Sequence, residues 1–264
     1  MDTFLHDIVH WGALIFSGFV AGAMNAVAGG GTLVTFPTLI LAGLSSIHAN
    51  ATSTVALLPA SLASAAGYRS HVPAVARWLR IFAPVSLMGG LLGGILLVRT
   101  PERVFDWLVP FLLLFATVLF MSQAAISRFS GIRIVEAHGA PPSRLRLAGG
   151  VLFQLCVAVY GGYFGAGIGI LMLASLSLQG FDDVHQMNTL KVMLGFLINV
   201  VAAGYFVING LVEWPSALIM MLGAVMGGYA GAHLAQRVPQ QGVRGVITAI
   251  GILISAVMFY RQFM

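Results

Sequence analysis

Long apolar runs alternate with short polar breaks along almost the whole chain. Eight of the runs have about the 20 residues that a helix needs to cross the hydrocarbon core of a bilayer. These runs lie at about 8–28, 50–68, 78–98, 104–122, 147–164, 187–208, 214–234 and 242–260. Two shorter apolar stretches, at about 32–43 and 168–179, fit half-helices or re-entrant segments. The pattern predicts an all-α polytopic membrane protein with about eight to ten membrane segments, some of them broken.

The composition supports this interpretation. Of the 264 residues, 59% are hydrophobic and 8% are charged, whereas a soluble domain carries about 25% charged residues. Lipid must therefore cover most of the surface. The net charge of +5 does not indicate nucleic acid, because the arginines cluster at the ends of apolar runs, where they set the orientation in the membrane.

One polar linker divides the chain. It covers about 123–146 and is basic and rich in turn-forming residues. We expect a first transmembrane repeat at 1–122 and a second at 147–264, each built from five membrane elements when the short one is counted.

The two halves resemble each other residue by residue. His48 and His185 stand 137 positions apart (from 48 to 185), and the same offset relates Thr54 to Lys191. The glycine-rich breaks match at an offset of 139. Matches at nearly one offset indicate an internal duplication, which is a recurring plan of secondary transporters.

Charge indicates how the halves are oriented. Nine arginines fall on one side of the membrane if each half has five elements, and that side is the cytoplasmic one by the positive-inside rule. These are Arg69, Arg77, Arg80, Arg128, Arg133, Arg144, Arg146, Arg237 and Arg244. The halves are then inverted relative to each other, with both termini outside the cytoplasmic membrane. Arg99 and Arg103 fall on the outer side and count against this scheme.

Each half carries a glycine-rich break between its first long run and its short one. The residues concerned are Gly29, Gly30, Gly31 and Thr32 in the first half, and Gly165, Gly167 and Gly169 in the second. Broken backbone persists in a bilayer only where it is buried in protein or faces a cavity. A helix that restarts there presents free N–H groups and a positive dipole end, which favour an anion.

The alternative role for these glycines is close packing of helices. Pairs with GxxxG spacing let two helix backbones approach each other. We assign Gly90/Gly94 and Gly227/Gly231 to packing, because they lie inside long apolar runs. The glycine triplet exceeds what packing needs, and we therefore favour a binding site there.

A polar patch near the start of the next run is a second candidate. Amide and hydroxyl groups could be directed at an oxyanion by Asn50, Thr52, Ser53 and Thr54, and Asn188 and Thr189 occupy the corresponding turn of the second half. The alternative is a helix start capped by Asn50 or Thr52 at the membrane surface. The sequence leaves both open.

Isolated polar residues inside the runs form a third group. Lys191 is the sharpest of them, because a charge within a span is costly and is usually functional, and here it would neutralise an anion. A lysine near a helix end that reaches toward the interface is the alternative. Asn25, Gln154 and Asn199 are either interhelical hydrogen bonds or ligands.

Several chemistries lack their motifs. The chain has no HExxH, GxSxG, Walker A or Cys/His metal spacing, so we expect no catalytic residue, metal or cofactor. No Asp or Glu lies at the centre of a run, although carriers coupled to protons or sodium mostly need one. An anion leaving a cell that is negative inside gains about 2.3 kcal/mol per charge per 100 mV, so export does not require a coupling acid.

The stretch GFVAGAMNAVAGGGTLVTFPTLILAGLSSIHANATST, together with GGYFGAGIGILM in the second half, resembles the TauE/SafE family of bacterial membrane transporters. The resemblance implies export of sulfite or an organosulfonate by alternating access. Carried over by position, it implies a site at Gly29, Gly30, Gly31, Asn50, Thr52 and Ser53, with Gly165, Gly167, Gly169 and Thr189 opposite. Two alternative functions stay open, an anion channel and a carrier for thiosulfate or a carboxylate. A homo-oligomer also stays possible.

Overall fold

The structure is a computed structural model, and it describes most of the chain. The described residues are 2–27, 30–130, 144–179, 181, 183–234, 252 and 259. Gly29, most of the expected linker and most of the expected run at 242–260 lie outside them, as do Arg133, Arg237 and Arg244.

Within this part the chain is helical, and the nine expected elements that fall there are all helices. They are α1 (Asp2–Val27), α2 (Thr32–Leu41), α3 (Ser46–Gly67), α4 (Val72–Arg99), α5 (Glu102–Ser130), α6 (Arg144–Tyr163), α7 (Ile168–Leu178), α8 (Val184–Ile208) and α9 (Trp214–Leu234). A short 3-10 turn, η1 (Arg69–His71), joins α3 to α4. The expected linker is shorter than the sequence suggested, because α5 and α6 both extend into it.

The two short helices reach only part of the way through the bundle. Helix α2 has 10 residues and α7 has 11. At 1.5 Å per residue each is about half as long as a bilayer core is thick. They therefore have the dimensions of the half-helices that the sequence predicts.

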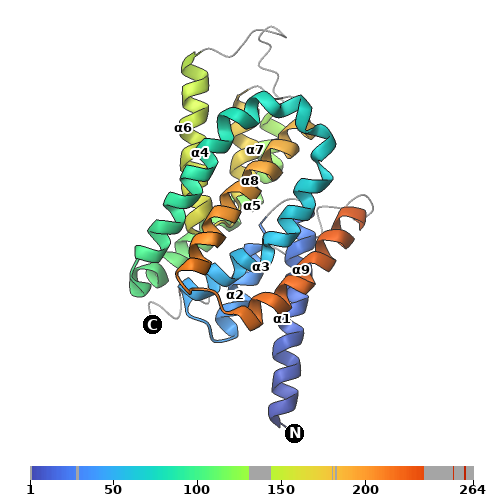
Figure 1. Ribbon diagram of the computed structural model, residues 1–264, viewed down its shortest axis with the longest axis vertical. Coiled ribbons are helices and arrows are strands. Elements are labelled where there is room, and N and C mark those ends of the chain that lie inside the picture. The colour runs from blue at the N-terminus through green and yellow to red at the C-terminus, as the bar shows by residue number, and fades with distance from the viewer. Residues whose placement is uncertain are drawn as a thin grey trace.

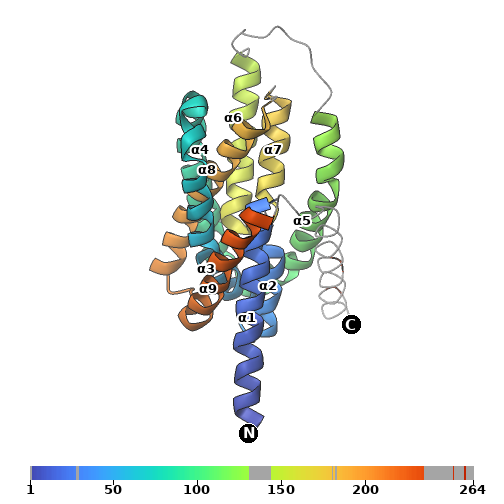
Figure 2. The same ribbon diagram turned by 90° about the vertical axis from the view of Figure 1, so that its right-hand side faces the viewer.

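The two broken elements approach from opposite ends of the bundle (Figures 1 and 2). Helix α1 enters from the lower end in both views and α2 turns back toward it, whereas α6 enters from the upper end and α7 turns back upward. We call the end where α5 finishes and α6 begins the linker end, and the opposite end the distal end. Both breaks consequently lie in the interior of the bundle.

The most extensive contacts between helices join the first half of the chain to the second. Helix α1 packs mainly on α9, α4 packs mainly on α6 and α8, and α3 packs on α9 and α8. Neither α1 nor α4 makes its most extensive contact within its own half.

Glycines make the closest of these crossings. A Cβ at Gly227 of α9 would overlap the backbone oxygen of Phe19, and a Cβ at Gly22 of α1 would overlap that of Ala224. At Gly90 a Cβ would lie 2.8 Å from the backbone oxygen of Ile198. The packing role expected for Gly90 and Gly227 is confirmed, because both stand where helix backbones touch.

Large apolar side chains cover much of the outer surface. Phe16 of α1 is 69% exposed, and Phe115, Leu152 and Leu222 are exposed on α5, α6 and α9. Two helical segments of the described chain, Arg69–Arg99 and His185–Ile208, are long and apolar enough to cross a membrane. Four other apolar helical stretches are shorter than 18 residues by the same measure. Exposed apolar side chains on this scale are what a lipid environment requires.

Candidate functional site

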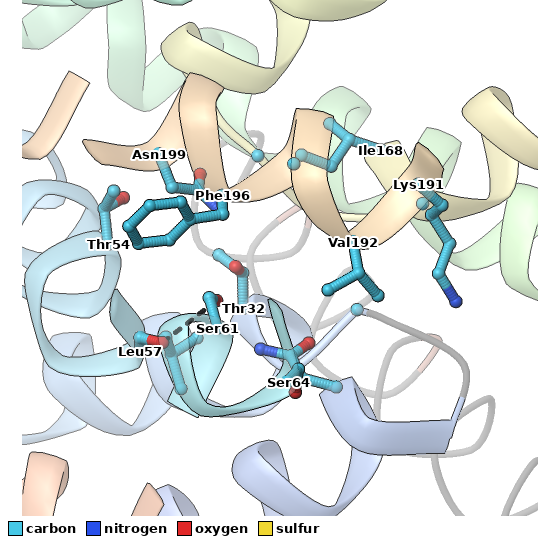
Figure 3. Close-up of a pocket in the computed structure, with 15 residues that line it drawn as sticks. Thr32, Thr54, Leu57, Ser61, Ser64, Ile168, Lys191, Val192, Phe196 and Asn199 are labelled. Atoms are coloured by element: carbon cyan, nitrogen blue, oxygen red, sulfur yellow. Dashed lines mark hydrogen bonds between the residues drawn. The ribbon is translucent and has the colours of Figure 1, made fainter. Parts of the chain in front are cut away.

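A cavity of about 90 Å³ lies between α3 and α8, at the point where both helix breaks reach the interior (Figure 3). The first break contributes Gly30 and Thr32, and the second contributes Gly165 and Gly169. One cavity thus joins two breaks that lie more than a hundred residues apart in the sequence.

Local backbone geometry explains the first break. Gly30 has φ +97°, a conformation that glycine adopts without the steric cost of a side chain. The Leu33 N–H donates to the Gly30 carbonyl at 2.9 Å, and the Gly31 N–H donates to Asn25 Oδ1 at 2.9 Å. The Thr32 N–H has no acceptor among the described residues. This N–H stands at the start of α2, beside the cavity, unpaired within the described chain.

The second break uses two left-handed glycines. Gly165 has φ +82° and Gly167 has φ +78°, and the Ile170 N–H closes the first turn on the Gly167 carbonyl at 3.0 Å. Within the described chain, the N–H groups of Gly167, Ile168 and Gly169 have no acceptor. Two of these residues, Ile168 and Gly169, line the cavity.

The electrostatic character of the cavity follows from these two helix starts. Both α2 and α7 direct their N-terminal ends at it, and each carries the positive end of a helix dipole there. Among the described residues that line it there is no Asp or Glu, and Lys191 is the one charged side chain. The cavity is built to favour a negative ligand.

Lys191 lies two turns after the start of α8 and is 7% exposed. None of the described residues accepts a hydrogen bond from its ammonium group, and Nζ is not among the fully buried polar atoms. Figure 3 shows Lys191 at one end of the cavity and Thr54 and Asn199 at the other. The ammonium group therefore meets the cavity without an internal partner, and a bound anion would supply one.

One face of α3 forms the opposite wall. Thr54, Leu57, Ser61 and Ser64 follow one another at helical spacing and all line the cavity. The hydroxyls donate to backbone carbonyls of the preceding turn, as Thr54 does to Asn50 at 2.9 Å. Among the described residues, the side-chain donors left for a ligand in this state are Lys191, the Thr32 hydroxyl and the amides of Asn25 and Asn199.

The structure brings together only some of the residues that the sequence singled out. Those that line the cavity are Gly30, Thr32, Gly165, Gly169 and Lys191. Those that do not are Gly31, Asn50, Thr52, Ser53, Gly167, Asn188 and Thr189. Gly29 lies outside the described residues.

Sequence reasoning gave too little weight to the far end of α3. Ser61 and Ser64 were not singled out, although they continue the helical face that begins at Thr54. Following that face at spacings of three and four residues would have found both. Asn25 and Asn199 also line the cavity, whereas Gln154 donates to Ser86 at 2.9 Å between α6 and α4.

The polar patch of α3 does not cap the helix, as one reading of the sequence had suggested. Helix α3 begins at Ser46, with Ser45 at its N-cap, so Asn50 and Thr52 stand inside it. In the second half, Asp183 caps α8 and accepts from the His185 N–H at 2.7 Å. Both helices start a turn earlier than their apolar runs.

The patch instead bonds to neighbouring elements on the distal side of the cavity. Asn50 Nδ2 donates to the Tyr163 carbonyl at 2.9 Å, and Thr52 Oγ1 accepts from the Glu213 N–H at 3.0 Å. Both of these bonds join the first half to the second. The Ser53 hydroxyl lies 2.6 Å from that of Thr35 on α2. The Asn50 amide nitrogen and the two hydroxyls are therefore engaged inside the protein in this state, whereas Asn50 Oδ1 is buried without a partner among the described residues.

Comparison with known proteins agrees with the architecture. The family model described as "Sulfite exporter TauE/SafE" matches residues 14–258. The chain is 26% identical to a probable membrane transporter protein of Haemophilus influenzae, over 95% of both chains. It is 25% identical to the probable membrane transporter protein YfcA of Escherichia coli K12, over 94% of this chain and 89% of that one. It is 28% identical to a probable membrane transporter protein, ORF9, of a Sinorhizobium species, over 92% and 89%. No solved structure matches significantly.

Proposed function

We propose that the protein exports a small sulfur oxyanion, because the chain belongs to the sulfite exporter TauE/SafE family. Membership of this family makes it a membrane transporter and not an enzyme. Sulfite or an organosulfonate would bind in the cavity between the two breaks. The observation that carries the proposal is the convergence of Lys191 and two helix N-termini on one cavity whose described lining holds no carboxylate. Such a site suits an anion and repels a cation.

The helix arrangement supports an inverted repeat that crosses the cytoplasmic membrane several times. Helix α1 enters from the distal end and α6 from the linker end (Figure 1). The pairing of α1 with α9 corresponds to that of α6 with α4, and the pairing of α3 with α9 corresponds to that of α8 with α4. Exchanging the halves therefore maps each major contact onto another.

Charge supports a cytoplasmic linker end. Arg69, Arg77 and Arg80 are exposed there, around the turn between α3 and α4. Arg99 and Arg103 lie at the distal end, so the asymmetry is partial. By the positive-inside rule, the distal end faces outward, and an exported anion leaves through it.

Alternating access follows from the position of the cavity. From the level of Thr54, its lining continues along α3 to Ser64, one turn before that helix ends at the linker side. On the distal side, the bonds from Asn50 to Tyr163 and from Glu213 to Thr52 join the halves. We call this pair of bonds the distal gate, and export requires it to open.

The Thr52→Val substitution is expected to open the distal gate more often. Valine keeps the shape of threonine but leaves the Glu213 N–H without its acceptor, which destabilises the closed state by about 1–3 kcal/mol. A cysteine placed at Thr54, in a Cys156→Ser background, should then react at least about 5-fold faster with an impermeant thiol reagent added from outside.

Thr189→Val is the matched control for this experiment. Thr189 corresponds to Thr52 in the second half, but its hydroxyl donates to the His185 carbonyl of its own helix at 2.6 Å. Labelling should be unchanged in that variant. Equal labelling in Thr52→Val and in the parent would show that the bond from Glu213 to Thr52 does not keep the distal gate closed.

Flux through purified protein tests the proposed function directly. Proteoliposomes loaded with sulfite, sulfoacetate or thiosulfate should release at least one of them by a saturable process that a negative interior potential accelerates. Turnover of tens to thousands per second fits a carrier, whereas single-channel currents would identify an anion channel. Absence of flux for all three anions would refute the proposal.

A further inference from the structure

We propose that Asn25 is a direct ligand of the transported anion, and that the same side chain braces the first helix break. The inference rests on the proposed function, since it concerns the anion site of that transporter. Asn25 is in the last turn of α1 (Asp2–Val27) and is among the residues that line the cavity.

The amide has two ends with different surroundings. Asn25 Oδ1 accepts the Gly31 N–H at 2.9 Å across the break. Asn25 Nδ2 has no acceptor among the described residues. Reversing the amide would set its NH₂ group against the Gly31 N–H, donor to donor, so the bond fixes the orientation. The amide donors are therefore left for a ligand.

Gly31 is shaped to receive this side chain. A Cβ at position 31 would lie 3.0 Å from both Asn25 Oδ1 and Asn25 Nδ2, and 2.7 Å from the Ala21 carbonyl. No room exists for any other residue while the bond is kept. Gly31 does not line the cavity, and its role in this account is to admit the Asn25 amide.

The second break is braced in another way. The Tyr160 hydroxyl donates to the Ala166 carbonyl at 2.8 Å, and Tyr160 is not among the cavity-lining residues. The Tyr160 hydroxyl has one proton, and the backbone carbonyl accepts it. The Asn25 amide uses only its oxygen at the first break, so its NH₂ group can still donate to a ligand. The difference makes Asn25 a binding group and leaves Tyr160 a structural one.

The donors around the cavity define the ligand that Asn25 serves. Its NH₂ group acts together with the Lys191 ammonium and the free N–H groups of Thr32 and Gly169. Because these groups line one cavity, an anion with several oxygens, such as a sulfonate head group, offers acceptors to more than one of them. A halide offers no fixed oxygen positions and gains less from this arrangement.

The Asn25→Asp variant separates the two roles. A carboxylate keeps an acceptor for the Gly31 N–H, so the thermal unfolding midpoint of the purified full-length protein should hold. The donor is replaced by a second acceptor that repels an anion, so sulfite affinity measured by calorimetry should fall at least about 10-fold. Asn25→Ala, which adds no charge, should lower both the affinity and the unfolding midpoint.

A control variant and the parent protein complete the test. Asn209→Ala removes an exposed amide that donates to Tyr205 at the end of α8, and it should bind sulfite like the parent. If the parent binds neither sulfite nor a sulfonate, the proposed function fails. If the parent binds sulfite and both Asn25 variants bind it equally well, the proposed function stands and the role of Asn25 is refuted.

Discussion

Replacing Lys191 with methionine is expected to weaken anion binding by about 10- to 100-fold while making the empty protein more stable. The first effect follows because a hydrogen bond to a charged group contributes about 1.5–3 kcal/mol. The second follows because Lys191 is 7% exposed and none of the described residues accepts from it, so its charge is largely removed from water without an internal partner.

The opposite signs of the two effects are the diagnostic result. Replacing a residue that merely supports the fold would lower the stability of the protein and its affinity for the anion together. Methionine fills nearly the same volume without charge, so its thermal unfolding midpoint should rise by at least about 2 °C as sulfite affinity falls. Lys191→Arg keeps the charge and should retain more of the affinity than Lys191→Met. Unchanged sulfite affinity in Lys191→Met would remove this residue from the site.

The Gly227→Ala substitution is expected to have the largest effect on stability. Its Cβ would overlap the Phe19 carbonyl, and a backbone atom cannot move aside as a side chain can. Helices α1 and α9, which make the most extensive contact in the described bundle, must separate. We expect a loss of about 3 kcal/mol or more, or a fall of about 6–12 °C in the unfolding midpoint.

Gly204→Ala provides the control for that experiment. Gly204 lies inside α8, is exposed, and has nothing within 4 Å of a Cβ placed on it. Alanine is the better helix former by about 1 kcal/mol, so the unfolding midpoint should stay level or rise. Similar midpoints for the two variants would mean that the α1–α9 crossing is looser than described.

The helices were predictable from the sequence because the bilayer imposes their length. Apolar runs predicted nine elements with most of their ends within four residues, and the shortness of α2 and α7 was visible as well. The starts of α1 and α4 and the end of α5 were placed less well, and α6 also begins inside the linker. Both α5 and α6 continue into a polar segment, where backbone hydrogen bonding sustains a helix after the apolar signal has ended.

The site was only partly predictable, for a reason that lies in α3. Asn50, Thr54, Ser61 and Ser64 share one face, and composition does not say which part of that face meets the cavity. Thr54 and Ser61 line the cavity, whereas Asn50, one turn before Thr54, donates to the end of α6. Thr52 lies on another face and accepts from the α8–α9 loop. Only the packing of the second half decides which of these residues meet the cavity, and that packing is set by helix crossings far away in the sequence.

The exchange of partners between the halves also has a consequence for synthesis. Helix α9 begins 187 residues after α1 ends (from 27 to 214). At about 5–20 residues per second, the ribosome needs about 10–40 seconds to make that stretch. During this interval the face of α1 that carries Gly18 and Gly22 lacks the helix that later covers it. A chain that stops before α9 leaves this face of α1 uncovered.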